Sequence, residues 1–163
     1  MTKTYLVDTA KYQPESLASY ARAGAKAAIV QVSVAKSIVA PKAKAQVKSA
    51  KANGLVPMGY FYACFGNSVS EAEAETHFAV TQAEAVGIPN GSFLGVDWES
   101  QDNNTSGGPR SNTNAILAAM NVIKKAGYKP LLYSSASLMR TKIDTARVID
   151  KFGTCLWVAS YPY

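Results

Sequence analysis

Two carboxylates stand two residues apart in the segment Val96-Asp97-Trp98-Glu99. Side chains alternate along a strand, so Asp97 and Glu99 are expected to share one face, with their Cα atoms about 7 Å apart. Burial and mutual repulsion raise the pKa of one member of such a pair, which places a proton donor beside an anion. That division suits cleavage of a glycosidic bond, in which an acid protonates the leaving oxygen and an anion stabilises an oxocarbenium-like centre. A solvated strand end would explain the same two residues without any chemistry.

A third carboxylate, Asp8, ends an apolar run that begins at Tyr5. An aspartate in this place also serves as a helix N-cap or a turn residue. If residues 4–8 form a strand, Asp8 takes a place at its end equivalent to that of Asp97. We therefore predict that Asp8, Asp97 and Glu99 converge at one end of the strands.

Polar and aromatic side chains gather near the ends of other strand-like runs. Gln31 and Ser33 alternate with valines at positions 30, 32 and 34, so they are expected to face away from those valines. The aromatic candidates are Tyr60, Tyr62, Tyr133, Trp157 and Tyr161. Rings of this kind stack on sugars and tyrosine hydroxyls bind ligands, although packing in a core explains each ring equally well. We predict that Gln31 and these aromatic residues bind substrate around the carboxylates.

Glycines mark the ends of the expected helices. A β-rich apolar run follows each of Gly24, Gly54, Gly87, Gly127 and Gly153. Glycine ends helices because it adopts the left-handed conformation without a Cβ clash. The glycines recur at intervals of about 30 residues, the size of one βαβ unit. Together with a first strand at residues 4–8, they predict six parallel strands joined by five crossover helices.

Helix starts are expected at Pro14, at Pro41 and at a capping box formed by Ser70-Glu71-Ala72-Glu73. A fourth helix is expected over residues 111–126, where apolar residues recur at helical spacing. Residues 101–110 are rich in Asn, Ser and Gly, so they are expected to form a long loop before this helix.

Six strands and five helices fit either an open doubly wound sheet or a (β/α)8 barrel that lacks its last strands. No Gly-rich phosphate-binding loop follows the first strand, where Val7-Asp8-Thr9-Ala10-Lys11 stands instead. Polar groups on one face near the carboxyl ends of parallel strands are what a barrel active site needs. We therefore predict an α/β fold of the TIM-like barrel type, incomplete at its C-terminus, in one domain covering residues 1–163.

The composition excludes several classes of protein. The 163 residues, 48% of them hydrophobic, suffice for one domain with a core. No apolar run approaches the roughly 20 residues of a membrane span, so membrane insertion is not expected. A single histidine, His77, argues against a His-rich metal site, and neither a metal nor a cofactor is expected. The net charge of +6 favours anionic partners, but no nucleic-acid-binding motif accompanies it.

The ordered segments resemble those of the glycoside hydrolase family 25 muramidases, the Chalaropsis-type lysozymes found in phage endolysins and bacterial autolysins. Each segment is weak alone, but together they span essentially the whole chain. They are residues 7–13, 50–54, 59–62, 96–99, 132–135 and 156–161.

The resemblance implies a role for each carboxylate. Glu99 would be the general acid/base, Asp97 would orient the 2-acetamido group of the substrate, and Asp8 would be a supporting carboxylate. The acetamido oxygen would attack the anomeric carbon, so configuration would be retained; a direct nucleophile is the alternative. The substrate would be the β-1,4 bond between N-acetylmuramic acid and N-acetylglucosamine in bacterial peptidoglycan. Such an endolysin would be made in the host cytoplasm without a signal peptide and would act on the cell wall after release.

The family continues past the segment Leu156-Trp157-Val158-Ala159 into two further strands, whereas this sequence stops at Tyr163. We therefore expect a truncated domain that is weakly active or inactive and self-associates through its open barrel edges. Two alternatives to a hydrolase of this family remain. One is a non-catalytic fragment that binds cell-wall glycan. The other is a metal-dependent enzyme acting on phosphodiesters or sugar phosphates, with Asp8, Asp97 and Glu99 binding Mg²⁺.

Overall fold

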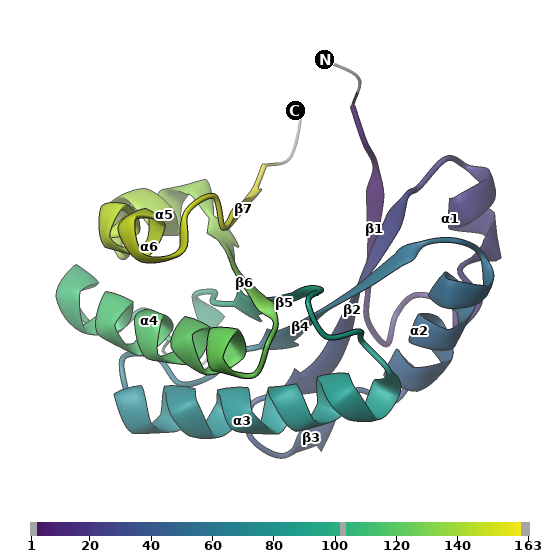
Figure 1. The fold of residues 1–163 in the computed structure, drawn as a ribbon. Helices are drawn as coiled ribbons and strands as arrows, with labels where there is room; N and C mark the ends of the chain where they lie inside the picture. The colour runs from purple at the N-terminus through teal and green to yellow at the C-terminus, as the bar shows by residue number, and fades with distance from the viewer. Residues whose placement is uncertain (1–2, 102–103, 161–163) are drawn as a thin grey trace.

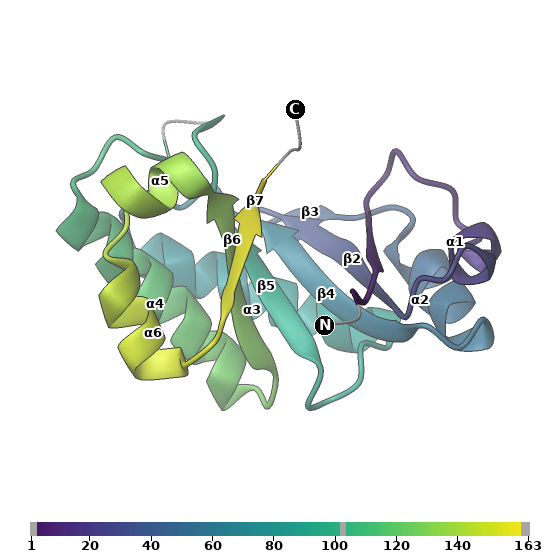
Figure 2. The same cartoon turned by 90° about the horizontal axis from the view of Figure 1, so that it is seen from above.

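The computed structural model describes residues 3–101 and 104–160, in which six parallel strands form one sheet curled into half of a barrel (Figure 1, Figure 2). The strands lie side by side in chain order, because each crossover helix adds the next strand beside the preceding one. A short strand pairs antiparallel with the end of β2. The strands are β1 (Leu6–Thr9), β2 (Ala27–Val34), β3 (Ile38–Val39), β4 (Val56–Tyr62), β5 (Phe93–Asp97), β6 (Lys129–Ser135) and β7 (Leu156–Ala159). The α/β half-barrel of TIM-like type that the sequence predicts is confirmed.

The helices cover the outer face of the curled sheet (Figure 1). They are α1 (Ala18–Arg22), α2 (Ala43–Ala52), α3 (Val69–Val86), α4 (Pro109–Lys125), α5 (Ala136–Thr141) and α6 (Thr145–Phe152). In α4, the side chains of Ile116, Met120 and Ile123 are fully buried, as the helical periodicity predicts. No helix in the described part of the chain is both long and apolar enough to pass through a membrane.

The main core lies between the sheet and these helices. Valines of β2 and leucines of β5 and β6 contribute one face of each strand to it. The two largest fully buried side chains are Trp98 and Phe61, at or beyond the ends of β5 and β4. Burial of side chains this large stabilises the carboxyl ends of the central strands, where the candidate site was predicted.

Several helix boundaries differ from the sequence prediction. The N-cap of α3 is Ser68, whose hydroxyl accepts a hydrogen bond from the backbone N–H of Glu71 (3.3 Å), so Ser70 lies inside the helix. Ser68 and Glu71 have the same spacing as the expected box, and the backbone is extended at Ser68, as an N-cap requires. Pro14 lies before the start of α1, not at it, and Pro109 already belongs to α4.

The single helix expected between the last two strands is two short helices, α5 and α6. Asp144 separates them because its side chain caps a new helix by accepting a hydrogen bond from the backbone N–H of Arg147 (3.3 Å).

An irregularity in β2 changes which residues face the candidate site. Gln31 lies opposite Tyr60 in β4, but the next pair joins Ser33 to Phe61, so Val32 is an extra residue. Beyond Val32, each side chain of β2 faces the side of the sheet opposite to the one that regular alternation predicts. Val34 lies opposite Tyr62, on the same face as Gln31, whereas Ser33 is fully buried. The prediction that Gln31 and Ser33 share a face opposite to Val34 is therefore wrong.

The strand order ends at β1 on one side and at β7 on the other, so these two strands are the edges of the half-barrel. An apolar hollow of about 410 Å³ lies on the inner face of the sheet. Its lining comes from both edges and from the strands between them: Leu6, Ile29, Met58, Phe93, Leu131, Leu156, Trp157 and Val158. Edge strands with exposed apolar side chains favour pairing with another chain.

We expect the isolated 163-residue chain to self-associate through these edges. Val158→Lys should reduce the association, because it places a charge on an edge side chain that is 43% exposed. Val69→Lys is the matched control, since Val69 is 44% exposed but lies at the start of α3. Sedimentation velocity over a range of concentrations measures the effect. A wild-type chain that stays monomeric would contradict the prediction.

Candidate active site

One open cavity of about 640 Å³ lies at the carboxyl ends of the first strands. Five of the predicted site residues line it: Asp8, Gln31, Tyr60, Tyr62 and Glu99. They come from β1, β2, β4 and the segment after β5, so the parallel sheet brings together residues up to 91 positions apart (99 − 8). The volume falls within the range of small-ligand sites, and the carboxyl end of the strands is where barrel enzymes bind substrate.

Asp97 is the last residue of β5 and is buried, with 7% of its surface exposed. Its carboxyl group is hydrogen-bonded to Glu99, and its Oδ1 atom has no hydrogen-bond partner among the described residues. Burial, this hydrogen bond and the negative charges of Glu99 and Asp8 raise the pKa of Asp97 well above its usual range. Asp97 therefore keeps its proton at neutral pH, in a hydrogen bond with Glu99.

Asp8 faces the same pair from β1. Burial raises its pKa, a hydrogen bond from the Tyr60 hydroxyl opposes this rise, and the charge of Glu99 adds to it. Burial and the nearby Asp8 carboxylate also raise the pKa of Tyr60. The Tyr60 hydroxyl therefore keeps its proton and acts as a hydrogen-bond donor at neutral pH.

The segment between the two carboxylates is fixed by hydrogen bonds to both neighbouring strands. The backbone N–H of Trp98 donates to Tyr133 O (3.0 Å), and the hydroxyl of Ser134 donates to Trp98 O (2.7 Å). On the other side, the backbone N–H of Ala63 donates to Asp97 O (2.9 Å). Side chains that follow β5 are therefore held at defined positions although the strand itself has ended.

The predicted aromatic residues divide into two groups. Tyr60 and Tyr62 line the cavity, and the Tyr62 hydroxyl is hydrogen-bonded to Gln101 Oε1 (3.1 Å). Tyr133 and Trp157 are not among the lining residues. Trp157 lines the apolar hollow and packs edge-on against Tyr60, with ring centroids 6.0 Å apart, and against Tyr133 at 4.6 Å. Tyr161 lies outside the described residues.

Besides Ala10 and Val34, four lining residues were not among the predicted set: Lys11, Tyr12, Gln13 and Gln101. Three of these four belong to the loop after β1. A hydrogen bond within the loop stabilises its conformation. Gln13 Oε1 accepts a hydrogen bond from the backbone N–H of Ala10 (2.8 Å). Tyr12 is 81% exposed, and Lys11 Nζ lies 5.1 Å from the centroid of its ring. The position of Lys11, Tyr12 and Gln13 directly after the strand that carries Asp8 is the signal that would have identified them, since βα loops form barrel active sites.

The described part of the chain contains no group of three or more His, Cys, Asp or Glu side chains arranged to hold a metal ion.

Comparison with known proteins relates this arrangement to one family. The family model described as "Glycosyl hydrolases family 25" matches residues 7–163. The lysozyme of Lactococcus phage mv1 is 45% identical over 163 residues, covering 99% of this chain and 81% of that protein. The lysozyme of Streptococcus phage Cp-1 is 31% identical over 134 residues, covering 82% of this chain and 36% of that protein.

Among solved structures, the modular Cpl-1 endolysin complexed with a peptidoglycan analogue superposes with a TM-score of 0.83 at 28% identity. The match covers 96% of this chain and 44% of that endolysin, so this chain spans less than half of the modular protein. With the family model matching nearly all of its length, the chain belongs to family 25 of the glycosyl hydrolases and is a glycoside hydrolase by sequence and fold.

Proposed function

We propose that the protein is a lysozyme that cleaves the β-1,4 bond between N-acetylmuramic acid and N-acetylglucosamine in bacterial peptidoglycan. The observation that supports this best is that Asp8 and Glu99 line one cavity while Asp97, buried behind it, is hydrogen-bonded to Glu99. Residues 1–163 then act as a single catalytic domain. The complex of the Cpl-1 endolysin with a peptidoglycan analogue supports the choice of substrate.

In this mechanism Glu99 donates the proton, because it lines the cavity whereas Asp97 lies behind it. The proton held by Asp97 passes to Glu99 along the hydrogen bond that joins the two carboxyl groups, and Glu99 donates it to the leaving glycosidic oxygen as the C–O bond breaks. Asp97, then an anion, accepts a hydrogen bond from the N–H of the 2-acetamido group, whose carbonyl oxygen forms a bond to the anomeric carbon. Glu99 next takes a proton from a water molecule, whose oxygen forms a bond to the anomeric carbon as the bond to the acetamido oxygen breaks, so configuration is retained after two inversions. The carboxylate of Asp8, on β1, stabilises the developing positive charge.

The remaining residues bind the sugar. Tyr60, Tyr62 and Gln31 contact the glycan in the cavity, while the ring of Trp157, itself packed against Tyr133, supports Tyr60 from behind. The net charge of +6 favours approach to an anionic wall. We infer an endolysin made in the host cytoplasm, acting on the wall after release.

The test is product analysis on purified peptidoglycan. Reduction of the products with borohydride should convert muramic acid, and not glucosamine, at the new reducing ends. EDTA should leave the rate unchanged, whereas loss of activity in EDTA would support the metal-dependent alternative. Binding to walls without release of reducing ends would instead support a glycan-binding module.

The proposal also predicts a pH effect for Asp8→Asn. The negative charge of Asp8 raises the pKa of Asp97, so removing that charge lets Asp97 lose its proton at lower pH. The alkaline limb of the kcat/KM profile should therefore move to lower pH, with activity still measurable. Asp150→Asn removes one carboxylate from α6 and is the matched control. An alkaline limb that stays at the same pH, or moves to higher pH, in Asp8→Asn would contradict the proposed coupling.

A further inference from the structure

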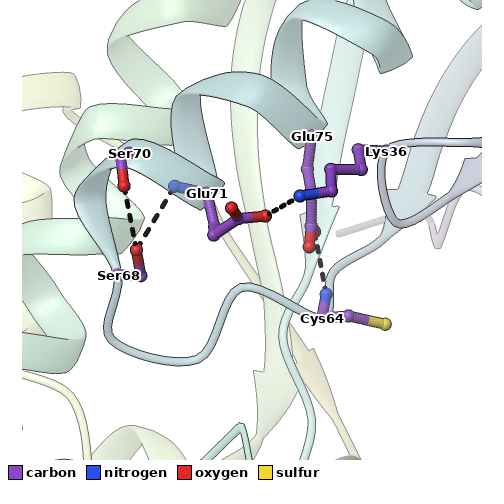
Figure 3. Close-up of polar contacts among 6 residues, drawn as sticks. All are labelled: Lys36, Cys64, Ser68, Ser70, Glu71 and Glu75. Carbon is purple, nitrogen blue, oxygen red and sulfur yellow. Dashed lines mark hydrogen bonds and ion pairs between the residues drawn. The ribbon is translucent and has the colours of Figure 1, made fainter.

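The turn that follows β4, residues 63–66, is held on one side by a buried acid. Glu75 in α3 is 3% exposed, and its Oε2 accepts a hydrogen bond from the backbone N–H of Cys64 (2.9 Å), as Figure 3 shows. The backbone N–H of Phe65 is a second donor to the same carboxyl group. Glu75 therefore fixes two successive backbone groups of the turn.

The nearby lysine does not compensate this buried acid directly. Lys36 Nζ forms its ion pair with Glu71 Oε2 at 2.7 Å, one helical turn from Glu75 and close to the surface (Figure 3). Burial raises the pKa of Glu75 to about 7, ahead of the opposing effect of the Cys64 hydrogen bond. A carboxyl group kept at such a desolvation cost calls for a role beyond filling space.

A second buried side chain holds the turn from the opposite side. Asn104 is fully buried and follows the candidate catalytic segment in sequence. Its Oδ1 accepts a hydrogen bond from the backbone N–H of Gly66 (2.6 Å), and its Nδ2 donates to Ala63 O (2.7 Å). The turn is thus clamped between α3 and the loop after β5.

The clamped turn contacts the segment that carries the candidate acid pair. Gly66 O accepts a hydrogen bond from the indole Nε1 of Trp98 (3.1 Å), and Ala63 donates to Asp97 O (2.9 Å). Trp98 is the residue between Asp97 and Glu99, and its side chain is fully buried. A displacement of the turn would therefore move the residues on both sides of Trp98.

We propose that Glu75 is a positioning residue for Asp97 and Glu99, acting through the turn of residues 63–66 and the indole of Trp98. This rests on the proposed function of that pair. Glu75 itself does not line the cavity, so its effect falls on the chemical step more than on substrate binding. Small displacements of catalytic groups lower kcat strongly, because the reacting atoms must meet at near-contact distances.

The experiment compares three variants at pH 6 on a soluble peptidoglycan fragment. Glu75→Ala should lower kcat about 10-fold with KM within about 2-fold of wild type. Glu75→Gln should retain kcat within about 3-fold, because its amide oxygen still accepts a hydrogen bond from Cys64. Glu71→Gln is the matched control on the same helix and should leave both constants unchanged. If Glu75→Ala does not fold, Glu75→Asp replaces it, since the shorter side chain withdraws the carboxyl group from the turn.

A second measurement is independent of activity. Exchange of the Trp98 indole proton with solvent, followed by NMR, should be about 10-fold faster in Glu75→Ala or Glu75→Asp than in wild type and unchanged in Glu71→Gln. A folded Glu75→Ala or Glu75→Asp with wild-type kcat, or with unchanged Trp98 exchange, would overturn the inference. A Glu75→Gln variant with a kcat as low as that of Glu75→Ala would overturn the inference as well. A wild-type protein without turnover would defeat the proposed function, while the exchange measurement would still decide the role of Glu75.

Discussion

Glu99→Gln is expected to lower kcat for peptidoglycan cleavage by about 100-fold or more while leaving the fold intact. The amide has the same shape as the acid but cannot donate a proton to the leaving oxygen or take one from water. Glu99 lines the cavity and is only partly buried, so the substitution creates no cavity in the core. Release of reducing ends from purified walls measures the loss, and circular dichroism verifies the fold.

Glu73→Gln is the matched control for Glu99→Gln. It makes the same chemical change on an exposed position of α3, and activity should remain at the wild-type level. Activity of Glu99→Gln within a few-fold of wild type would remove Glu99 from the mechanism. The other two carboxylates would then have to supply the proton.

Asp97→Asn is the second substitution with a large expected effect, a loss of about 100-fold in kcat. The amide can neither share the proton of the pair nor become the anion that polarises the acetamido group. Its effect on stability should be small or favourable, because the carboxyl group it replaces is buried, beside like charges, with Oδ1 unpaired among the described residues. Activity assays and thermal unfolding of the same preparation separate the two effects.

Comparison with Asp8→Asn makes the assignment of roles testable. Asp8 lines the cavity and is hydrogen-bonded to Tyr60, so its loss should weaken the reaction less than the loss of Asp97. A fully active Asp97→Asn beside an inactive Asp8→Asn would reverse the two assignments.

The placement of the three carboxylates could be predicted from the sequence, because it depends on simple regularities. Asp8 is the penultimate residue of β1 and Asp97 is the last residue of β5, and parallel strands present their carboxyl ends at one edge of the sheet. Tyr60 and Tyr62 share a face by alternation alone. These features need only the period of a strand and the order of the elements, both of which are visible in the pattern of residues.

Other features depend on contacts that no local pattern reveals. The extra residue at Val32 changes the face of Val34, and nothing in a run of alternating valines marks it. The choice of Ser68 over Ser70 as N-cap depends on where the turn after β4 directs the chain. Likewise, the clamp formed by Glu75 and Asn104 joins residues that are 29 positions apart (104 − 75) through a turn from a third element.

The burial of Trp98 gives the protein an intrinsic optical probe. The sequence contains two tryptophans, Trp98 and Trp157, so Trp157→Phe leaves one indole as the emitter. That indole is shielded from water and donates a hydrogen bond to Gly66 O, so its fluorescence should be displaced to shorter wavelengths relative to a solvated indole. Because its neighbours in the chain are Asp97 and Glu99, the emission reports any change in the polarity around them as a glycan enters the cavity. Ligand binding could then be followed in real time without labelling either the protein or the sugar.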